Sequence, residues 1–401
     1  MRFLRFIPCA IPFLLMSTTQ PLAASQTANV TFLRVPNNGN GPQVAVDAKG
    51  TVHLIYFKAA RGDHGDIYYV RSADGGATIT DPLRVNSELN SAIAARPPRL
   101  AVGRGGRAHV VWNGSDTAGP RGPRNPAQPA DSPYNGTPLL YARLNDAGTA
   151  FEPQRNLMRK TFTLDGGATI AADDEGNVYG VWHALAPNQP EGEQARRVWV
   201  ARSTDDGKTF AEETMAWDQP TGACGCCHAG AFTDEKGNLY VLYRGAESAI
   251  QRDIYLLAST DHGKSFKGSK VDPWRTSTCP MSSMALARTR GGVLAGWETE
   301  GRVRFGAVKP DDATVAGREE PSAEESQRKD RKYPQIATNG AGETIRVWTE
   351  GMAWKRGGAA AWQVYDADGK PTDVKGRREG VPPDGDAAVF ARADGTFVII
   401  Y

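Results

Sequence analysis

The stretch of sequence that decides the fold is Val44-Ala-Val-Asp-Ala-Lys-Gly50-Thr-Val-His-Leu-Ile-Tyr56. Two apolar runs flank a short turn that contains glycine, and the second run ends in an aromatic residue six positions after that glycine. Near-continuous apolar character on both sides of a turn predicts a hairpin whose two strands are buried on both faces. We therefore searched the chain outward from this segment for the same pattern.

The hairpin pattern occurs seven times along the chain, and each glycine lies 51 to 70 residues from the next. The glycine and aromatic pairs are Gly50/Tyr56, Gly106/Trp112, Gly176/Trp182, Gly237/Tyr243, Gly291/Trp297, Gly342/Trp348 and Gly395/Tyr401. That spacing leaves room in each repeat for a second, outer hairpin, which is typical of a β-propeller blade. Repeats of solenoid proteins are shorter. We predict an all-β propeller with seven inner hairpins and one domain.

The outer hairpins contain a second pattern, S-x-D-x-G-x-[ST]-apolar. Its aspartate is expected to bind backbone N–H groups, its glycine to take a positive φ, and its last residue to fill the blade. The copies begin at Ser72, Ser203 and Ser259. On these turns the sequence resembles the Asp-box (BNR repeat) propellers of the sialidase-like superfamily, over residues 28–401. In that family the boxes lie away from the active face.

The number of blades and the closure of the ring are further expectations. The last repeat has two strands of its own before Tyr401, so we expect Val30 to Val35 to add a strand and close the ring. Because sialidases have six blades, the resemblance also allows a six-bladed ring in which the last hairpin packs differently.

Composition excludes several classes of protein. Hydrophobic residues make up 40% of the 401 residues and the mean hydropathy is −0.46, as in a soluble globular protein with a sizeable core. The 44 glycines and 26 prolines disfavour a helical bundle. The formal net charge is +2, and it is zero without Arg2 and Arg5, so nothing favours a nucleic-acid partner.

The first 24 residues have the order of a secretory signal peptide. Arg2 and Arg5 precede an apolar run from Phe6 to Met16, and small residues follow at positions 23–25. The run is too short to span a bilayer, so we expect cleavage, a periplasmic or secreted mature chain and no membrane span after cleavage. Cys9 leaves with this segment. Four cysteines then remain.

These cysteines are the main candidates for chemistry. Cys224, Cys226, Cys227 and His228 precede the inner strand of the fourth repeat, and Cys279 and Met281 precede that of the fifth. Neighbouring loops of a propeller emerge side by side near its axis, so these groups are expected to converge. Soft sulfur ligands with an imidazole suit copper or zinc, and this metal site is the predicted function.

Two other interpretations of the same segment stay open. An exported protein commonly forms disulfides, and a bond from Cys279 to Cys224, Cys226 or Cys227 would be ordinary. A second bond between the two remaining thiols is also open but costly, because disulfides between such close neighbours in sequence are often strained. The segment Cys224-Gly-Cys-Cys227-His228 also matches C-x-x-C-H, the attachment pattern of haem c, for which Cys224, Cys227 and His228 would be the binding residues and Met281 a possible sixth ligand.

The family resemblance implies an alternative function, a carbohydrate-active propeller that hydrolyses or binds a glycan or another small molecule. Sialidases use an arginine triad, a Tyr/Glu nucleophile and an aspartate acid, and the stretch Arg34-Val-Pro36 resembles one of their motifs although it lies before the expected position. If the protein is an enzyme, it is then a sialidase-like glycoside hydrolase with structural disulfides. Its candidate catalytic residues, from loops and strand ends of one face, are Asp63, Asp66, Arg96, Arg244 and Glu298.

Overall fold

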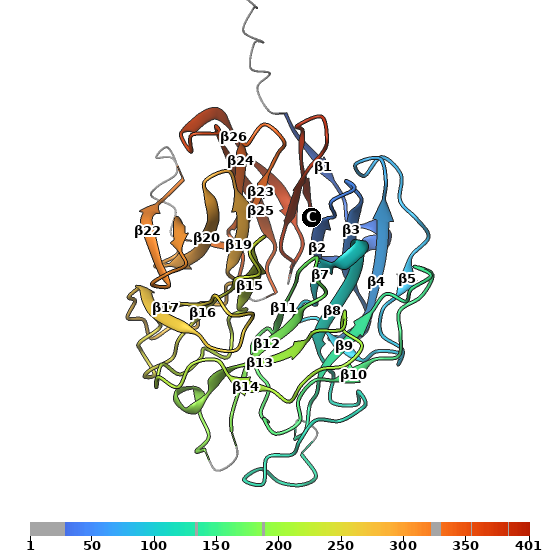
Figure 1. The fold of residues 1–401 in the computed structure, drawn as a ribbon, viewed down its shortest axis with the longest axis vertical. Coiled ribbons are helices and arrows are strands. Elements are labelled where there is room, and N and C mark those ends of the chain that lie inside the picture. Colours follow the sequence, from blue (N-terminus) through green and yellow to red (C-terminus); the bar gives the residue numbers. More distant parts are fainter. Residues whose placement is uncertain (1–28, 133–134, 187–188, 322–329, 354, 384) are drawn as a thin grey trace, which may run out of the picture.

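A computed structural model describes residues 29–132, 135–186, 189–321, 330–353, 355–383 and 385–401. The predicted signal peptide lies outside the described residues. The strands of the described part form seven separate sheets arranged around one axis (Figure 1). The prediction of a seven-bladed, all-β propeller is confirmed. No helix in these ranges is long and apolar enough to cross a membrane.

Each blade is a meander in which the first strand lies nearest the axis. Blades 1 to 3 consist of β2 (Asn40–Val46), β3 (Val52–Arg61), β4 (His64–Ser72), β5 (Leu83–Arg84) and β6 (Ala92–Ile93); β7 (Arg99–Gly103), β8 (Arg107–Asn113), β9 (Leu139–Arg143) and β10 (Arg155–Asn156); and β11 (Thr169–Ala172), β12 (Val178–Ala184), β13 (Arg197–Ser203) and β14 (Thr214–Met215). Three short 3₁₀ turns, η1 (Pro36–Asn38), η2 (Arg104–Gly106) and η3 (Glu193–Ala195), lie between strands.

Blades 4 to 6 have four strands each: β15 (Gly230–Thr233), β16 (Leu239–Arg244), β17 (Ile254–Ser259) and β18 (Lys267–Asp272); β19 (Ala285–Thr289), β20 (Gly292–Thr299), β21 (Arg302–Lys309) and β22 (Thr314–Glu319); and β23 (Arg331–Thr338), β24 (Thr344–Glu350), β25 (Gly358–Tyr365) and β26 (Pro371–Val381). Blade 7 consists of β27 (Ala388–Ala391), β28 (Phe397–Ile400) and β1 (Val30–Leu33). The innermost strands of successive blades contact one another all the way round, and β27 contacts β2.

The N-terminal strand closes the ring, as predicted. Strand β1 pairs in parallel with β28, with Val30 opposite Phe397 and Leu33 opposite Ile400. Figure 1 shows β1 (blue) beside the C-terminal strands (red). The six-bladed alternative is wrong, because the last hairpin forms a blade of its own with this borrowed strand.

The hairpin pattern that predicted the fold also supplies its core. The aromatic residue at the end of each inner hairpin is at most 4% exposed, from Tyr56 in blade 1 to Tyr401 in blade 7. In the first hairpin Asp47 accepts hydrogen bonds from the backbone N–H groups of Lys49 and Thr51, and Gly50 takes a φ of 81° that a residue with a Cβ rarely adopts. Apolar strands buried on both faces therefore alternate with turns fixed by local polar bonds.

The outer S-x-D-x-G turns have the predicted hydrogen bonds. In blade 3 the Ser203 hydroxyl donates to Asp205 at 2.7 Å, and the Asp205 carboxylate accepts from both the N–H and the hydroxyl of Thr209. Phe210 packs edge-on against Tyr141, as expected for a residue that fills the blade. The turn in blade 1 departs from the expectation, since its apolar residue, Ile79, is 48% exposed.

Candidate functional site

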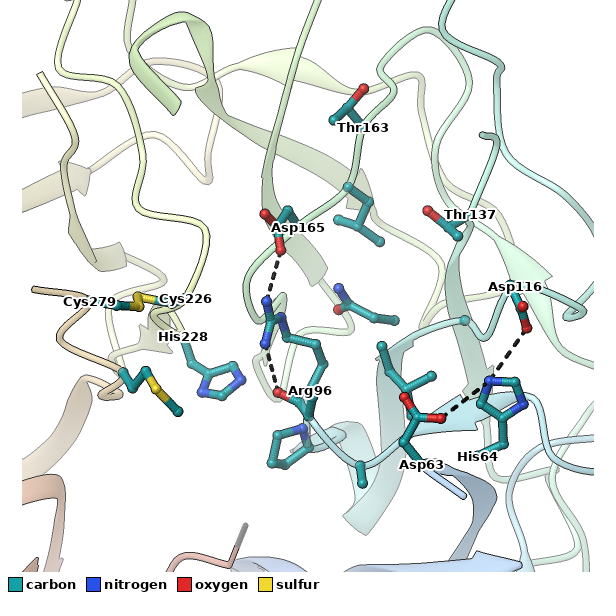
Figure 2. A pocket seen from close by; sticks show the side chains of 18 of the residues that line it. Asp63, His64, Arg96, Asp116, Thr137, Thr163, Asp165, Cys226, His228 and Cys279 are labelled. Atoms are coloured by element: carbon teal, nitrogen blue, oxygen red, sulfur yellow. Dashed lines mark hydrogen bonds and ion pairs between the residues drawn. A yellow bond between two sulfur atoms is a disulfide. The ribbon is translucent and has the colours of Figure 1, made fainter. Parts of the chain in front are cut away.

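A cavity of about 870 Å³ lies at one end of the propeller axis. The loops that precede the innermost strands supply part of its walls, and the turn between β3 and β4 and the segment that follows β8 supply another part. Figure 2 shows His228 and the Cys226–Cys279 pair on one side, Asp63, His64 and Asp116 on the other, and Arg96 and Asp165 between them. The loop before β15, which contains Cys224, Cys226 and Cys227, and the loop before β19, which contains Cys279, are the two cysteine loops. Both reach the same axial face, as predicted.

His228 holds the two cysteine loops and the third blade together. Its backbone pairs with Gly167 on one side and with Ser283 on the other, and its N–H donates to the Ser282 carbonyl at 3.0 Å. A Cβ on Gly167 would overlap the His228 ring. Glycine is therefore required at this position for the loop before β11 to pass the imidazole. The juxtaposition of the loops before β15 and β19 is confirmed.

Four sulfur atoms gather beside this imidazole. Cys226 and Cys279 form a disulfide, and Cys224 and Cys227 are free. The Cys224 Sγ lies 3.4 Å from the Cys226 Sγ and 3.6 Å from the Cys227 Sγ, and the Cys226 and Cys227 Sγ atoms are 4.0 Å apart. Of the three partners that the sequence left open for Cys279, the structure selects Cys226.

The sulfur group is smaller than the predicted ligand set. The sulfur atoms of Cys224, Cys226 and Cys227 all lie within 4.8 Å of one another. Among the described residues, His228 and Cys279 do not belong to that group. His228 and Met281 instead line the cavity next to it.

Burial and charge give the two free thiols opposite properties. Burial raises the pKa of Cys227, but the Cys224 thiol and the guanidinium of Arg244 outweigh it and lower that pKa to about 6. The hydrogen bond to Cys227 and burial raise the pKa of Cys224 far above its usual range. The pair thus shares one proton near neutral pH, with Cys227 as the thiolate.

A buried ion pair between Arg244 and Glu298 lies next to the loop that contains Cys224 and Cys227. Arg244 is 2% exposed and its Nη2 lies 2.8 Å from the Glu298 carboxylate. Burial raises the pKa of Glu298, against the effect of Arg244. The Arg244 carbonyl also accepts a hydrogen bond from the Cys224 N–H at 2.9 Å. The predicted catalytic candidates Arg244 and Glu298 therefore do not line the cavity, and the expectation that they face it is corrected.

The remaining catalytic candidates divide between the cavity and the core. Asp63 and Arg96 line the cavity, where the Asp63 carboxylate lies 3.6 Å from the His64 ring. Asp66 is buried and accepts hydrogen bonds from the Asn86 amide and the Asn90 N–H. This carboxylate does not line the cavity, so its position fits a structural part and corrects the prediction that it faces the site.

The cavity also contains charged residues that sequence reasoning missed. Asp165 binds Arg96 at 2.8 Å and Arg196 at 3.0 Å, and although burial raises the pKa of Asp165, these two guanidinium groups lower it below its usual range. Asp386 is 3% exposed, and burial raises its pKa to about 6 in spite of the charge on Arg99. The cavity thus presents a paired carboxylate and a carboxyl that is partly protonated near neutral pH.

Two buried histidines stay neutral at this site. Burial, together with the charges of Arg99 and Arg96, lowers the pKa of His228 well below its usual value. The His228 Nε2 has no hydrogen-bond partner among the described residues. Burial and the charge of Arg196 lower the pKa of His183 to about 3. Neutral imidazoles with an unused nitrogen are suited to bind metals or polar ligands.

No protein-family model matches the chain, and no curated protein is similar to it in sequence. Among solved structures, an α-L-arabinanase of Penicillium chrysogenum complexed with arabinobiose has a TM-score of 0.52 and 14% identity, over 85% of this chain and 98% of that one. A protein of unknown function from Dyadobacter fermentans has a TM-score of 0.51 and 15% identity, over 86% and 96%.

A sialidase, NanB of Streptococcus pneumoniae, has a TM-score of 0.51 and 10% identity, over 82% of this chain and 68% of that one. The likeness lies in the fold. At these identities it agrees with the propeller architecture and leaves the chemistry to the residues of this chain. The site must therefore be interpreted from its own geometry.

Proposed function

We propose that this protein is exported and binds a soft transition metal, copper or zinc, through the sulfur cluster on its axial face. The three sulfur distances of 3.4, 3.6 and 4.0 Å carry the proposal. Two thiolates at about 2.3 Å from one tetrahedral Zn(II) lie about 3.8 Å apart. Cys224, Cys226 and Cys227 thus match one face of a tetrahedron.

The oxidation state of Cys226 decides whether the site is complete. A sulfur atom in a disulfide is not a thiolate, and thiolates are the ligands that soft metals prefer. Reduction of the Cys226–Cys279 bond would complete the three-sulfur face and free Cys279 as a fourth ligand. His228 and Met281, on the cavity side of the cluster, would then lie next to the ion. The position of Arg244 beside Cys227 supports the thiolate form.

We expect protein purified under reducing conditions, without chelator, to contain about one metal ion per chain. Cys227→Ser should lower this content strongly with little loss of the fold, because the variant removes one thiolate and keeps the size of the side chain. Elemental analysis and thermal unfolding measure the two effects. Thr278→Ala, an exposed change beside Cys279, is the matched control. Full metal occupancy in Cys227→Ser would remove Cys227 from the site.

The absorption spectrum of the same sample tests haem c. Cys224 and Cys227 are both 2% exposed and neither lines the cavity, so in this conformation the attachment sulfurs of C-x-x-C-H do not face a space that holds a macrocycle. The geometry therefore favours a bare ion over haem. A Soret band from protein made in a host competent in haem attachment would reverse that choice.

A second candidate function is the binding or hydrolysis of a carbohydrate in the axial cavity. Its volume of about 870 Å³ and its lining by Asp63, Asp165 and Arg96 favour a small polar ligand. The arabinanase of similar fold was solved with arabinobiose. We therefore place arabinobiose and sialosides first among the glycans to be tested.

If the cavity hydrolyses a glycan, Asp63→Asn should abolish turnover and leave binding measurable, because the amide keeps the shape of the carboxyl and cannot transfer its proton. Hydrolysis is followed by release of reducing sugar and binding by calorimetry. Asp66→Asn is the control for the fold, since Asp66 does not line the cavity. Equal turnover in Asp63→Asn and the parent would exclude Asp63 as the acid.

A further inference from the structure

The cysteine cluster holds two oxidation states side by side. The disulfide Cys226–Cys279 touches the free dithiol Cys224/Cys227, with the Cys224 Sγ only 3.4 Å from the Cys226 Sγ. Thiol–disulfide exchange begins when a thiolate attacks a disulfide sulfur, and reacting atoms about 3 to 3.5 Å apart are in range for attack. The cluster thus places a nucleophile within reach of a bond it can break.

Burial separates the disulfide from the dithiol. Cys279 is exposed and Cys226 is half-buried, and both line the cavity. Cys224 and Cys227 are each 2% exposed and lie behind them. A disulfide that moved from the outer pair to the inner pair would leave two thiols at the cavity.

The backbone allows the inner pair to form a bond of its own. The Cys227 N–H bonds the Cys224 carbonyl at 3.5 Å, so the chain makes a turn between them, and their sulfur atoms are 3.6 Å apart. The ends of such a turn lie within about 7 Å of each other at Cα, which is near the range that a disulfide spans. Cys224 therefore has two possible partners, Cys226 and Cys227.

We propose that these four cysteines form a thiol–disulfide exchange relay. Cys224 loses to solvent the proton that it shares with Cys227 and attacks the Cys226 sulfur, the Cys224–Cys226 bond forms, and Cys279 leaves with the electron pair of the broken Cys226–Cys279 bond and takes up a proton. The Cys227 thiolate then attacks the Cys224 sulfur, the Cys224–Cys227 bond forms, and Cys226 leaves as a thiolate that is protonated. The inner pair loses the one proton that it shares, and the two outer sulfur atoms each take up a proton from solvent at the cavity. One disulfide forms for each one that breaks, so the exchange needs no external oxidant or reductant.

The relay has a consequence for the cavity. While Cys279 is bonded to Cys226, the loop before β19 is tied to the loop before β15. After exchange the main-chain pairing of His228 with Ser282 and Ser283 still joins the two loops, and Cys279 is a free, exposed thiol. The substrate class is then a disulfide of a small molecule or an extended peptide, which the Cys279 thiolate attacks to give a mixed disulfide and a released thiolate.

The test uses the mature protein without residues 1–24, and therefore without Cys9, kept metal-free with chelator so that a failure of the relay and a failure of metal binding are distinguishable. The protein is held at mildly alkaline pH for minutes to hours, the time that uncatalysed rearrangement takes. Exposed thiols are then alkylated with iodoacetamide, and the disulfides are mapped by peptide mass spectrometry. We expect Cys279 to take up label and the Cys224–Cys227 pair to appear, with two thiols per chain throughout.

Two variants distinguish the steps. Cys224→Ser should lose the labelling of Cys279, because it removes the attacking sulfur. Cys227→Ser should keep that labelling and accumulate the Cys224–Cys226 bond, because only the second step is blocked. If Cys279 in the parent stays unlabelled at every time point, or is labelled equally in Cys224→Ser, the relay is overturned. The map of the parent protein alone is decisive if a variant fails to fold.

Discussion

Replacing Arg244 by leucine is expected to lower the free energy of unfolding by about 3 to 5 kcal/mol, the cost of removing one partner of a buried ion pair. The change leaves the Glu298 carboxylate, which is 1% exposed, without its cationic partner. It also removes the guanidinium that donates to the Arg252 carbonyl and stacks over Trp274. Urea unfolding at neutral pH measures the loss.

The same variant should change the chemistry of the cysteine loop. Arg244 is one of the groups that lower the pKa of Cys227, so that pKa should rise in Arg244→Leu and the thiol should react more slowly at neutral pH. Since burial already raises the pKa of Glu298, acidification should protonate this carboxyl early and shrink the loss of stability as the pH falls.

The matched control is the double variant Arg244→Leu/Glu298→Leu. An apolar pair of similar volume removes both charges at once and should recover most of the lost stability, because no buried charge remains. An ion pair exposed to water contributes less than about 1 kcal/mol to stability. If Arg244→Leu loses no more than that, water reaches Glu298 and the pair is not buried in solution.

The fold was predictable because its signal repeats. Each inner hairpin has an apolar run, a glycine turn and a final aromatic residue. Because the pattern occurs seven times, a copy that is ambiguous by itself is identified by its spacing from the others. The family resemblance was the weaker guide, since it allowed six blades. The parallel pairing of β1 with β28 could be foreseen only from the missing strands of the last blade. The hairpin repeat therefore predicted the number of blades better than the family resemblance did.

The site was predictable in its place but not in its bonds. The propeller axis brings the loops before β15 and β19 together, so the meeting of Cys226 and Cys279 follows from the repeat. Three cysteines within four positions leave the choice of partner to side-chain directions that spacing does not specify. The burial of Arg244 was missed for a similar reason. Strands covered on both faces lack the alternation that tells inward from outward side chains.

The charged residues of the cavity were missed although the repeat contains a signal for them. Several cavity residues stand 15 to 17 positions before the final aromatic residue of their own hairpin: Arg96, Asp165, His228, Met281, Tyr333 and Asp386. Five of these residues lie in the loop just before an innermost strand, and Tyr333 lies near the start of β23. Aligning the repeats on their aromatic residues, and then examining the residues 15 to 17 positions before them, would have found Asp165 and Asp386 from the sequence.

Removing β1 is the second change with a large expected effect. A chain of residues 35–401 should lose at least about 4 kcal/mol relative to a chain of residues 29–401, from about 1 kcal/mol for each of two lost backbone hydrogen bonds and about 2 kcal/mol for the Phe32 side chain. The lost bonds include those from the Phe397 N–H to Asn29 and from the Tyr401 N–H to Leu33. Phe32 also packs edge-on against Trp362 at 5.1 Å.

The loss should appear as aggregation as well as a lower melting temperature, because blade 7 would keep only β27 and β28. Residues Phe397–Ile400 of β28, now at most 2% exposed, would become an apolar sheet edge that can pair with other chains. A synthetic peptide of residues 29–34 should restore the melting temperature in trans, since it can add the strand in parallel. If the two chains melt at the same temperature, β1 does not contribute to closing the ring. The contact between β27 and β2 then closes it alone.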